Sequence, residues 1–158
     1  DFAIQNGGGV RASVPAGDIT IKDVYTVLPF DNLVVAVKAT GKQIWDVLEH
    51  GISAYPAAAG QFLQVSGLEY TFDASKPPYE RLISVTSNGV PLDPEKTYTL
   101  TANDFLTGGG DKFTMFLEME KFIETKSFLR DAFAEYVERH GTIAPVNEGR
   151  ITILNPAN

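Results

Sequence analysis

Apolar and polar residues alternate along the chain with two different periods, and the shorter period predicts β-strands. Residues 97–102 (TYTLTA) alternate one by one, so we expect one face of a strand there to be buried. Residues 32–39 (NLVVAVKA) are apolar and rich in β-branched side chains, which favours another strand. Further stretches with strand character are residues 1–5, 62–73, 81–86 and 150–154. The pair Asn88-Gly89 predicts a turn between the strand at 81–86 and the next strand, at 97–103.

The longer period predicts two amphipathic helices. Residues 42–53 place apolar side chains on one helical face, and Pro56 follows them. These side chains are Ile44, Val47, Leu48 and Ile52. Residues 126–140 repeat the pattern, and Gly141 stands where a helix would end. Their apolar stripe is Phe128, Leu129, Ala132, Phe133, Tyr136 and Val137. Residues 19–28 fit either a short strand or a helix that Pro29 stops.

Together these elements predict an α+β fold, a mixed β-sheet with flanking helices, because hairpin-type strands and helices do not alternate regularly. With 158 residues, 44% of them hydrophobic, the chain is long enough for one domain with its own core. The chain opens inside an apolar strand and has no initiator Met. We therefore expect residues 1–158 to be one domain of a longer protein.

Charge and composition exclude several kinds of function. The net charge of -7 argues against binding to long nucleic acid, which needs clustered Lys and Arg. No apolar run approaches the roughly 18 residues of a membrane-spanning helix, so we expect no membrane span. The chain has no Cys, which excludes disulfides, zinc-thiolate sites and Cys nucleophiles. Its two histidines, His50 and His140, lie far apart in sequence, so we expect no dinuclear metal centre within this chain.

Three glycines in the stretch NGGGVR, residues 6–11, carry the first candidate chemistry. Glycine permits unusual backbone angles and lets the main chain approach a ligand closely, and exposed amides in such a turn can meet an anion. Arg11 would add a planar cation suited to phosphate or carboxylate oxygens. A tight turn followed by a surface arginine explains the same residues equally well. The stretch is neither a Walker loop nor a dinucleotide-binding fingerprint.

Two further loops each pair a phenylalanine with polar neighbours. In LPFDN, residues 28–32, Phe30 stands among polar residues, and in NDFLTGGGD, residues 103–111, Phe105 precedes three glycines. Either ring could anchor its loop to the core. Alternatively, the two rings could sandwich a flat heterocycle, and a base stacked on an aromatic side chain gains about 1–3 kcal/mol. Asp111, at the end of the second loop, would then suit the hydroxyls of a sugar.

The other aromatic side chains and the histidines have simpler interpretations. We expect four aromatic side chains to lie in the core: Trp45, Phe128, Phe133 and Tyr136. We expect His50 and His140 to lie at helix ends.

An ordered series of motifs resembles one protein family. The series runs from about Ala3 to Ile153, nearly the whole chain, and its order is more specific than any single motif. The stretches are NGGGVR, GDITIKDVYTVLPFDN, GKQIWDVLEHG, GQFLQVSGLEYTFD, NGVPLDPEKTYTLTANDFLTGGGDKF and EGRI. Together they resemble the C-terminal, substrate-binding domain of the 5'-nucleotidase and UDP-sugar hydrolase family.

The resemblance implies a division of labour between two domains. In the family, a separate N-terminal metallophosphoesterase domain holds two divalent metal ions and hydrolyses the phosphoester, while the C-terminal domain binds the nucleoside part of the substrate. For this chain the resemblance implies a nucleotide or nucleoside ligand, AMP-like or UDP-sugar-like, and an N-terminal domain of the same protein as partner. It implies no cofactor within residues 1–158, no catalytic residue, and a location outside the cytoplasm, in the periplasm, at the cell surface or secreted. We expect the parent protein to be a phosphoric ester hydrolase and this chain alone to be inactive.

The resemblance also implies a set of substrate-binding residues. Phe30 and Phe105 would stack on the base, Asp111 would bind the ribose hydroxyls, and Arg11 would engage the phosphate or ribose. The remaining positions would line the pocket or touch the base edge: Asn6, Gly8, Gly9, Asn32 and Gly60. Asp31 stands where glycine is frequent in the family. Family members also carry a helix and further basic residues before the NGGG turn, so we expect the N-terminal edge of the domain to be missing here.

Two functions of other classes stay open. The chain could be a non-catalytic nucleotide-binding module that works without a metal domain. It could also be a structural or adhesion module of an exported protein, in which the fold persists and the pocket is unused.

Overall fold

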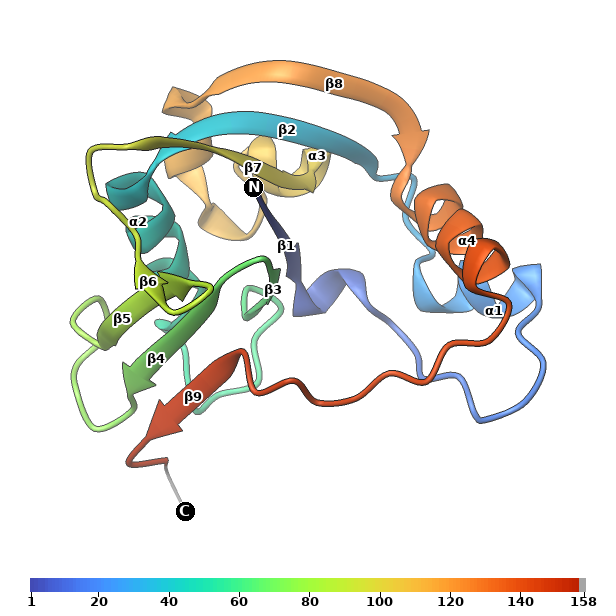
Figure 1. The fold of residues 1–158 in the computed structure, drawn as a ribbon, viewed down its shortest axis with the longest axis horizontal. Helices are drawn as coiled ribbons and strands as arrows, with labels where there is room; N and C mark the ends of the chain where they lie inside the picture. The colour runs from blue at the N-terminus through green and yellow to red at the C-terminus, as the bar shows by residue number, and fades with distance from the viewer. Residues whose placement is uncertain (157–158) are drawn as a thin grey trace.

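The strands of the computed structural model, which describes residues 1–156, form two sheets (Figure 1). The first sheet has the order β3-β1-β7-β2-β8, and the second has the order β6-β5-β4-β9. The strands of the first are β1 (Phe2–Asn6), β2 (Leu33–Thr40), β3 (Leu63–Ser66), β7 (Thr97–Asn103) and β8 (Glu120–Phe128). Those of the second are β4 (Glu69–Asp73), β5 (Leu82–Ser87), β6 (Val90–Pro91) and β9 (Ile151–Leu154).

Both sheets mix parallel and antiparallel neighbours. Strand β1 runs parallel to β7 and antiparallel to β3, while β4 runs parallel to β9 and antiparallel to β5. The helices are α1 (Ile21–Val27), α2 (Gly41–Ile52), α3 (Asp104–Thr107) and α4 (Leu129–His140). Short 3-10 turns form η1 (Gly7–Gly9), η2 (Gly110–Lys112) and η3 (Thr114–Glu118). The α+β fold predicted from the sequence, mixed sheets with flanking helices, is confirmed.

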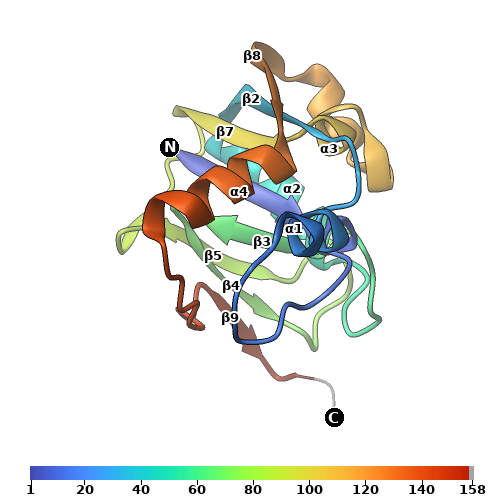
Figure 2. The same cartoon turned by 90° about the vertical axis from the view of Figure 1, so that its right-hand side faces the viewer.

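Helices α1 and α4 lie side by side at one end of the molecule, as both views show (Figures 1 and 2). The ambiguous stretch at residues 19–28 is helical because Thr20 and Asp23 form a reciprocal cap at the start of α1. From the end of α4, an extended connection crosses the molecule to β9 in the second sheet (Figure 1).

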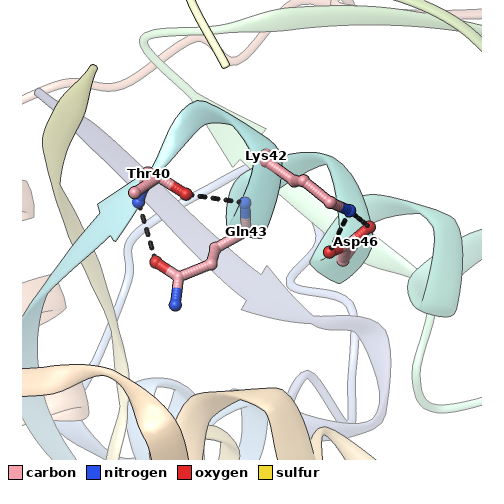
Figure 3. A network of polar contacts seen from close by, with 4 residues as sticks. All are labelled: Thr40, Lys42, Gln43 and Asp46. Atoms are coloured by element: carbon pink, nitrogen blue, oxygen red, sulfur yellow. Dashed lines mark hydrogen bonds and ion pairs between the residues drawn. The ribbon is translucent and has the colours of Figure 1, made fainter. Parts of the chain in front are cut away.

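Helix α2 lies between the two sheets, since it contacts β2 and β3 of the first and β5 of the second. Thr40 caps it: the Thr40 hydroxyl accepts a hydrogen bond from the Gln43 amide, and the Gln43 side chain accepts one from the Thr40 amide (Figure 3). The four apolar side chains predicted for its buried face are all buried: Ile44, Val47, Leu48 and Ile52. The buried Glu49 carboxylate accepts from the amides of Arg81 and Leu82, which ties α2 to β5.

Three predicted elements differ from the structure. Residues 62–73 form two strands in different sheets, because the backbone turns at Gly67 with a φ of 80°. The Asn88-Gly89 turn joins β5 to the short β6, whereas β7 pairs with β2 and β1 in the other sheet. The helix predicted from residue 126 begins at Leu129, because β8 occupies the preceding residues and pairs with β2.

The four aromatic residues expected in the core do not share one environment. Trp45 is half-buried and packs against the core. Phe128, which directly precedes α4, and Phe133, within α4, are also half-buried. The expectation for Tyr136 is wrong, because its side chain is 51% exposed and its ring lies against His140. Helix α4 therefore packs at the periphery of the protein, and its aromatic side chains do not join the central core.

Candidate functional site

Several separate segments of the chain line one cavity of about 340 Å³. Its lining residues are Asn6, Gly8, Gly9, Arg11, Phe30, Asn32, Gly60, Phe105 and Asp111. These are the substrate-binding candidates named from the sequence, and the structure brings all of them together. The volume lies within the range of about 300–1,000 Å³ that small-molecule sites occupy.

The glycines of η1 serve close packing between two chain segments. The amides of Gly7 and Gly8 donate to the carbonyl oxygens of Phe62 and Gly60, at 2.8 and 2.9 Å. A Cβ atom added at Gly8 would lie 3.0 Å from the Gly60 Cα. Of the two possibilities left open by the sequence, an anion-binding turn or a plain tight turn, Gly7 and Gly8 fit the second, because their amides are already bonded to protein carbonyls.

Both phenylalanine rings of the cavity are partly open to solvent. Phe30 is 49% exposed and Phe105 is 43% exposed, so neither ring is an anchor in the core. Gly110 leaves room for the second ring, because a Cβ atom there would lie 2.6 Å from two ring carbons of Phe105. Gly110 therefore allows the Phe105 side chain to fold back over the backbone.

Asp111 is held in place by a chain of amide side chains. Its Oδ2 accepts from Asn6 Nδ2 at 3.2 Å, and Asn6 Oδ1 accepts from Asn103 Nδ2 at 3.0 Å. The backbone of Asp111 is in the left-handed region, with a φ of 50°. Its other oxygen, Oδ1, has no hydrogen-bond partner among residues 1–156, so it can accept from a ligand.

His50 supports the backbone of Asp111. Its Nε2 lies 2.8 Å from the Asp111 carbonyl oxygen, and its Nδ1 lies 3.2 Å from the Tyr79 hydroxyl. Since a carbonyl can only accept, Nε2 carries the hydrogen, and in the neutral ring Nδ1 accepts from Tyr79. The ring is buried and meets the Phe113 ring edge-on, at 4.5 Å between centroids.

Sequence reasoning missed the support that His50 and Asn103 give to the site. His50 does lie in the last turn of α2, as predicted, but its position at a helix end gave no sign of a contact 61 residues away. Asn103 carried a local signal, because a polar residue that ends a strand and precedes a helix is a common cap. Its side chain indeed accepts from the Leu106 amide.

The polar neighbours of Phe30 are held by other elements. Asn32 Nδ2 donates to Asp104 Oδ1 at 2.9 Å. Asp31, at a position where glycine is frequent in the family, pairs with Arg130 of α4. Arg11 is exposed, donates to the Gly8 carbonyl oxygen at 3.3 Å and forms no ion pair with any residue that the structure describes. Its charge is therefore available to a ligand.

Neither a metal cluster nor a membrane-spanning helix occurs in the described part of the chain. Across residues 1–156 no three His, Asp or Glu side chains gather closely enough to hold a metal ion. None of the helices described here is long and apolar enough to cross a bilayer. The residues of the cavity can bind and orient a ligand, but they do not fit a metal site.

Comparisons with known proteins support the family resemblance seen in the sequence. The sequence model of the family described as 5'-nucleotidase, C-terminal domain, matches residues 1–118. The chain is 37% identical over 156 residues to the trifunctional nucleotide phosphoesterase protein YfkN of Bacillus subtilis (strain 168), covering 95% of the chain and 11% of that protein. It is 31% identical over 162 residues to snake venom 5'-nucleotidase of Gloydius brevicauda, covering 95% of the chain and 28% of that protein.

A solved structure has the same fold as this chain. The 5'-nucleotidase precursor from Thermus thermophilus superposes with a TM-score of 0.96 at 42% identity, covering 99% of this chain and 32% of that one. The chain thus spans less than a third of the length of each of these three relatives. It belongs to the 5'-nucleotidase family, as the C-terminal domain of that family.

Proposed function

We propose that this chain binds the nucleoside part of a nucleotide between Phe30 and Phe105 and holds the phosphate toward another domain of the same protein. The observation that carries this proposal is the single cavity into which two half-exposed phenyl rings, a carboxylate and a guanidinium are brought from distant parts of the sequence. Relatives whose names describe nucleotide phosphoesterases and 5'-nucleotidases support the choice of ligand.

Each part of a nucleotide has a chemically matched group in the cavity. The two rings offer flat apolar faces to a base, which gains from stacking whatever its hydrogen-bonding edge. The Oδ1 atom of Asp111 can accept from a ribose hydroxyl, because Oδ2 is already occupied by Asn6. Arg11 presents a permanently charged planar fork, which suits phosphate oxygens.

The hydrolytic step belongs outside this chain in our proposal. The family resemblance implies an N-terminal metallophosphoesterase domain with two divalent metal ions, which would polarise the phosphate and activate water. The residues of this chain contribute binding and orientation, and positioning a reactant can itself remove several kcal/mol from a reaction barrier. The whole protein is then a phosphoric ester hydrolase. We place it outside the cytoplasm, since a 5'-nucleotidase of snake venom is among its relatives.

Calorimetry with adenosine, AMP and UDP-glucose tests the ligand. Phe30→Ala and Phe105→Ala should each weaken adenosine binding by about fivefold or more, since one stacking contact contributes about 1–3 kcal/mol. Phe122→Ala is the matched control, because Phe122 is 39% exposed on β8 and does not line the cavity. Equal losses in all three variants would contradict a stacking role for the two rings.

The other function classes predict different results in the same experiment. A folded protein that binds none of the three ligands would support a structural or adhesion role. Phosphate release by residues 1–158 alone, with divalent metal ions added, would contradict the assignment of catalysis to another domain. Strong binding with no hydrolysis by the whole protein would favour a non-catalytic nucleotide-binding module.

A further inference from the structure

Helix α4 holds the loop that carries Phe30. The carbonyl oxygen of Phe30 accepts from Arg130 Nη1 at 3.2 Å, and the Asp31 carboxylate accepts from the same nitrogen. The Asn32 carbonyl oxygen accepts from the Leu129 amide at 2.8 Å. Three consecutive residues of the loop are therefore tied to the first two residues of α4.

Arg130 is itself fixed between two aromatic rings. Its guanidinium carbon lies 4.6 Å from the ring centroids of both Tyr25 and Phe128. The residue is only 8% exposed, and cation-π contacts are strongest where water is excluded. Because Tyr25 belongs to α1, the side chain of Arg130 joins α1, α4 and the Phe30 loop at one point.

A second contact fixes the same loop from the side of Phe105. Asp104 Oδ1 accepts from Asn32 Nδ2 at 2.9 Å and from the Leu33 amide at 3.1 Å. Asp104 directly precedes Phe105 at the start of α3. The loop of the first ring is thus held by Arg130 on one side and by the neighbour of the second ring on the other.

We propose that Arg130 is a positioning residue that sets the place of the Phe30 ring relative to Phe105, and thereby the affinity of the cavity for a planar base. Arg130 does not line the cavity and acts through the main-chain carbonyl of Phe30 and the carboxylate of Asp31. Phe30 has no place in the core, so its ring follows the backbone that Arg130 holds. This proposal rests on the proposed function, because it assumes that a base lies between the rings.

The test compares Arg130→Gln with Arg139→Gln in the full-length protein. Arg139 lies on the same helix but is exposed and pairs only with Glu135 among the described residues, which makes it a matched control. Hydrogen exchange of residues 28–34 in the free protein reads the loop directly, and calorimetry reads the affinities for adenosine and for ribose 5-phosphate. If the role of Arg130 is purely structural, the variant should bind both ligands less tightly to the same extent. If Arg130 positions the Phe30 ring, only the binding of adenosine, which carries the base, should weaken.

We expect Arg130→Gln to speed hydrogen exchange of the loop and to weaken adenosine binding by about tenfold, since bonds from a charged donor are lost. The affinity for ribose 5-phosphate should change by less than about twofold. Arg139→Gln should change none of these quantities. Unchanged exchange and unchanged adenosine affinity in a folded Arg130→Gln variant would overturn the proposal.

Asp31→Asn keeps the test decisive if Arg130→Gln does not fold. The Asp31 side chain is 76% exposed, so we expect this variant to fold. The same effects are expected, with adenosine binding weakened by about threefold. If the unaltered protein binds no adenosine, the proposed function fails. The exchange measurement then decides separately whether Arg130 holds the loop, and unchanged exchange overturns that part as well.

Discussion

Arg11 supplies the positive charge of a cavity whose other ionised side chain is Asp111. Because the guanidinium is exposed and bonds only to the Gly8 carbonyl oxygen among the described residues, it is placed to meet the anionic part of a ligand. Arg11→Gln should weaken AMP binding by about tenfold and change the affinity for adenosine by less than about twofold, since only AMP carries the phosphate. Calorimetry with both ligands measures the ratio. The control is Lys42→Gln, at the start of α2, because Lys42 does not line the cavity. A similar loss for both ligands would place Arg11 at the ribose or base.

His50 is expected to matter for stability through its bond to Asp111. His50→Phe keeps an aromatic ring beside Phe113 and removes the donor to the Asp111 carbonyl. Leaving that carbonyl without a partner should lower the free energy of unfolding by about 1–3 kcal/mol. Chemical denaturation measures this loss.

Tyr79→Phe is the control for that experiment, because it removes only the outer hydroxyl of the same chain of contacts. Tyr79 is 60% exposed, so its change should stay within about 0.5 kcal/mol. Equal losses in the two variants would show that the bond to Asp111 is not the important one.

At the scale of elements, the cap of α2 and a nearby surface pair allow a direct comparison (Figure 3). Thr40→Ala removes the side-chain acceptor for the Gln43 amide and should cost about 1 kcal/mol in the free energy of unfolding. Lys42→Ala removes the exposed pair with Asp46 and should cost less than about 0.5 kcal/mol. Thermal and urea unfolding measure both, and the reverse order would contradict the importance of the cap.

The sequence was most informative where local pattern and tertiary environment agree. Helix α2 carries a cap and a regular apolar face, and β2 is a run of apolar residues in a central strand, so both could be predicted. Strand β8 could not, because it is an edge strand whose side chains are mostly exposed and therefore show no apolar period. Its extended form depends on pairing with β2, a strand from a much earlier part of the chain, and no local signal in its own residues indicates that partner.

The candidate site divides in the same way. The residues that line the cavity were found through an ordered set of motifs, and the structure places them together. Their supporting residues were missed, because Arg130 contacts residues about 100 positions earlier and His50 contacts one 61 positions later. Contacts over such separations are decided by the path of the whole chain and leave no mark in a short window of sequence.

At the scale of the whole molecule, the Asp73 carboxylate at the end of β4 is one contributor to stability in acid. Hydrogen bonds from the Ser75 side chain, from Asn155 and from the Ser75 amide lower the pKa of Asp73 from 3.8 to about 2. The folded-state pKa lies below the unfolded one, so this stabilisation is complete above about pH 4 and is lost as the pH falls through about 2.

Asp73→Asn should therefore reduce the loss of stability that occurs as the pH falls from about 4 to about 2. Thermal midpoints measured from about pH 5 down to about pH 2 would show a smaller decrease for the variant than for the unaltered chain. Glu148→Gln, which removes an exposed pair with Arg150, serves as the control. An unchanged slope in Asp73→Asn would mean that other carboxylates govern unfolding in acid.

The cavity joins positions far apart along the polypeptide, since the bond between Asn6 and Asp111 alone spans 105 residues. It can exist only after both halves of the polypeptide have come together, so occupancy reports completed folding. A molecule bound there would act as a reversible cross-link, adding about 2.7 kcal/mol at a hundredfold excess over its Kd. After its release, the two halves would be held together only by the protein's own contacts. Resistance to proteolysis would therefore depend on the concentration of the ligand.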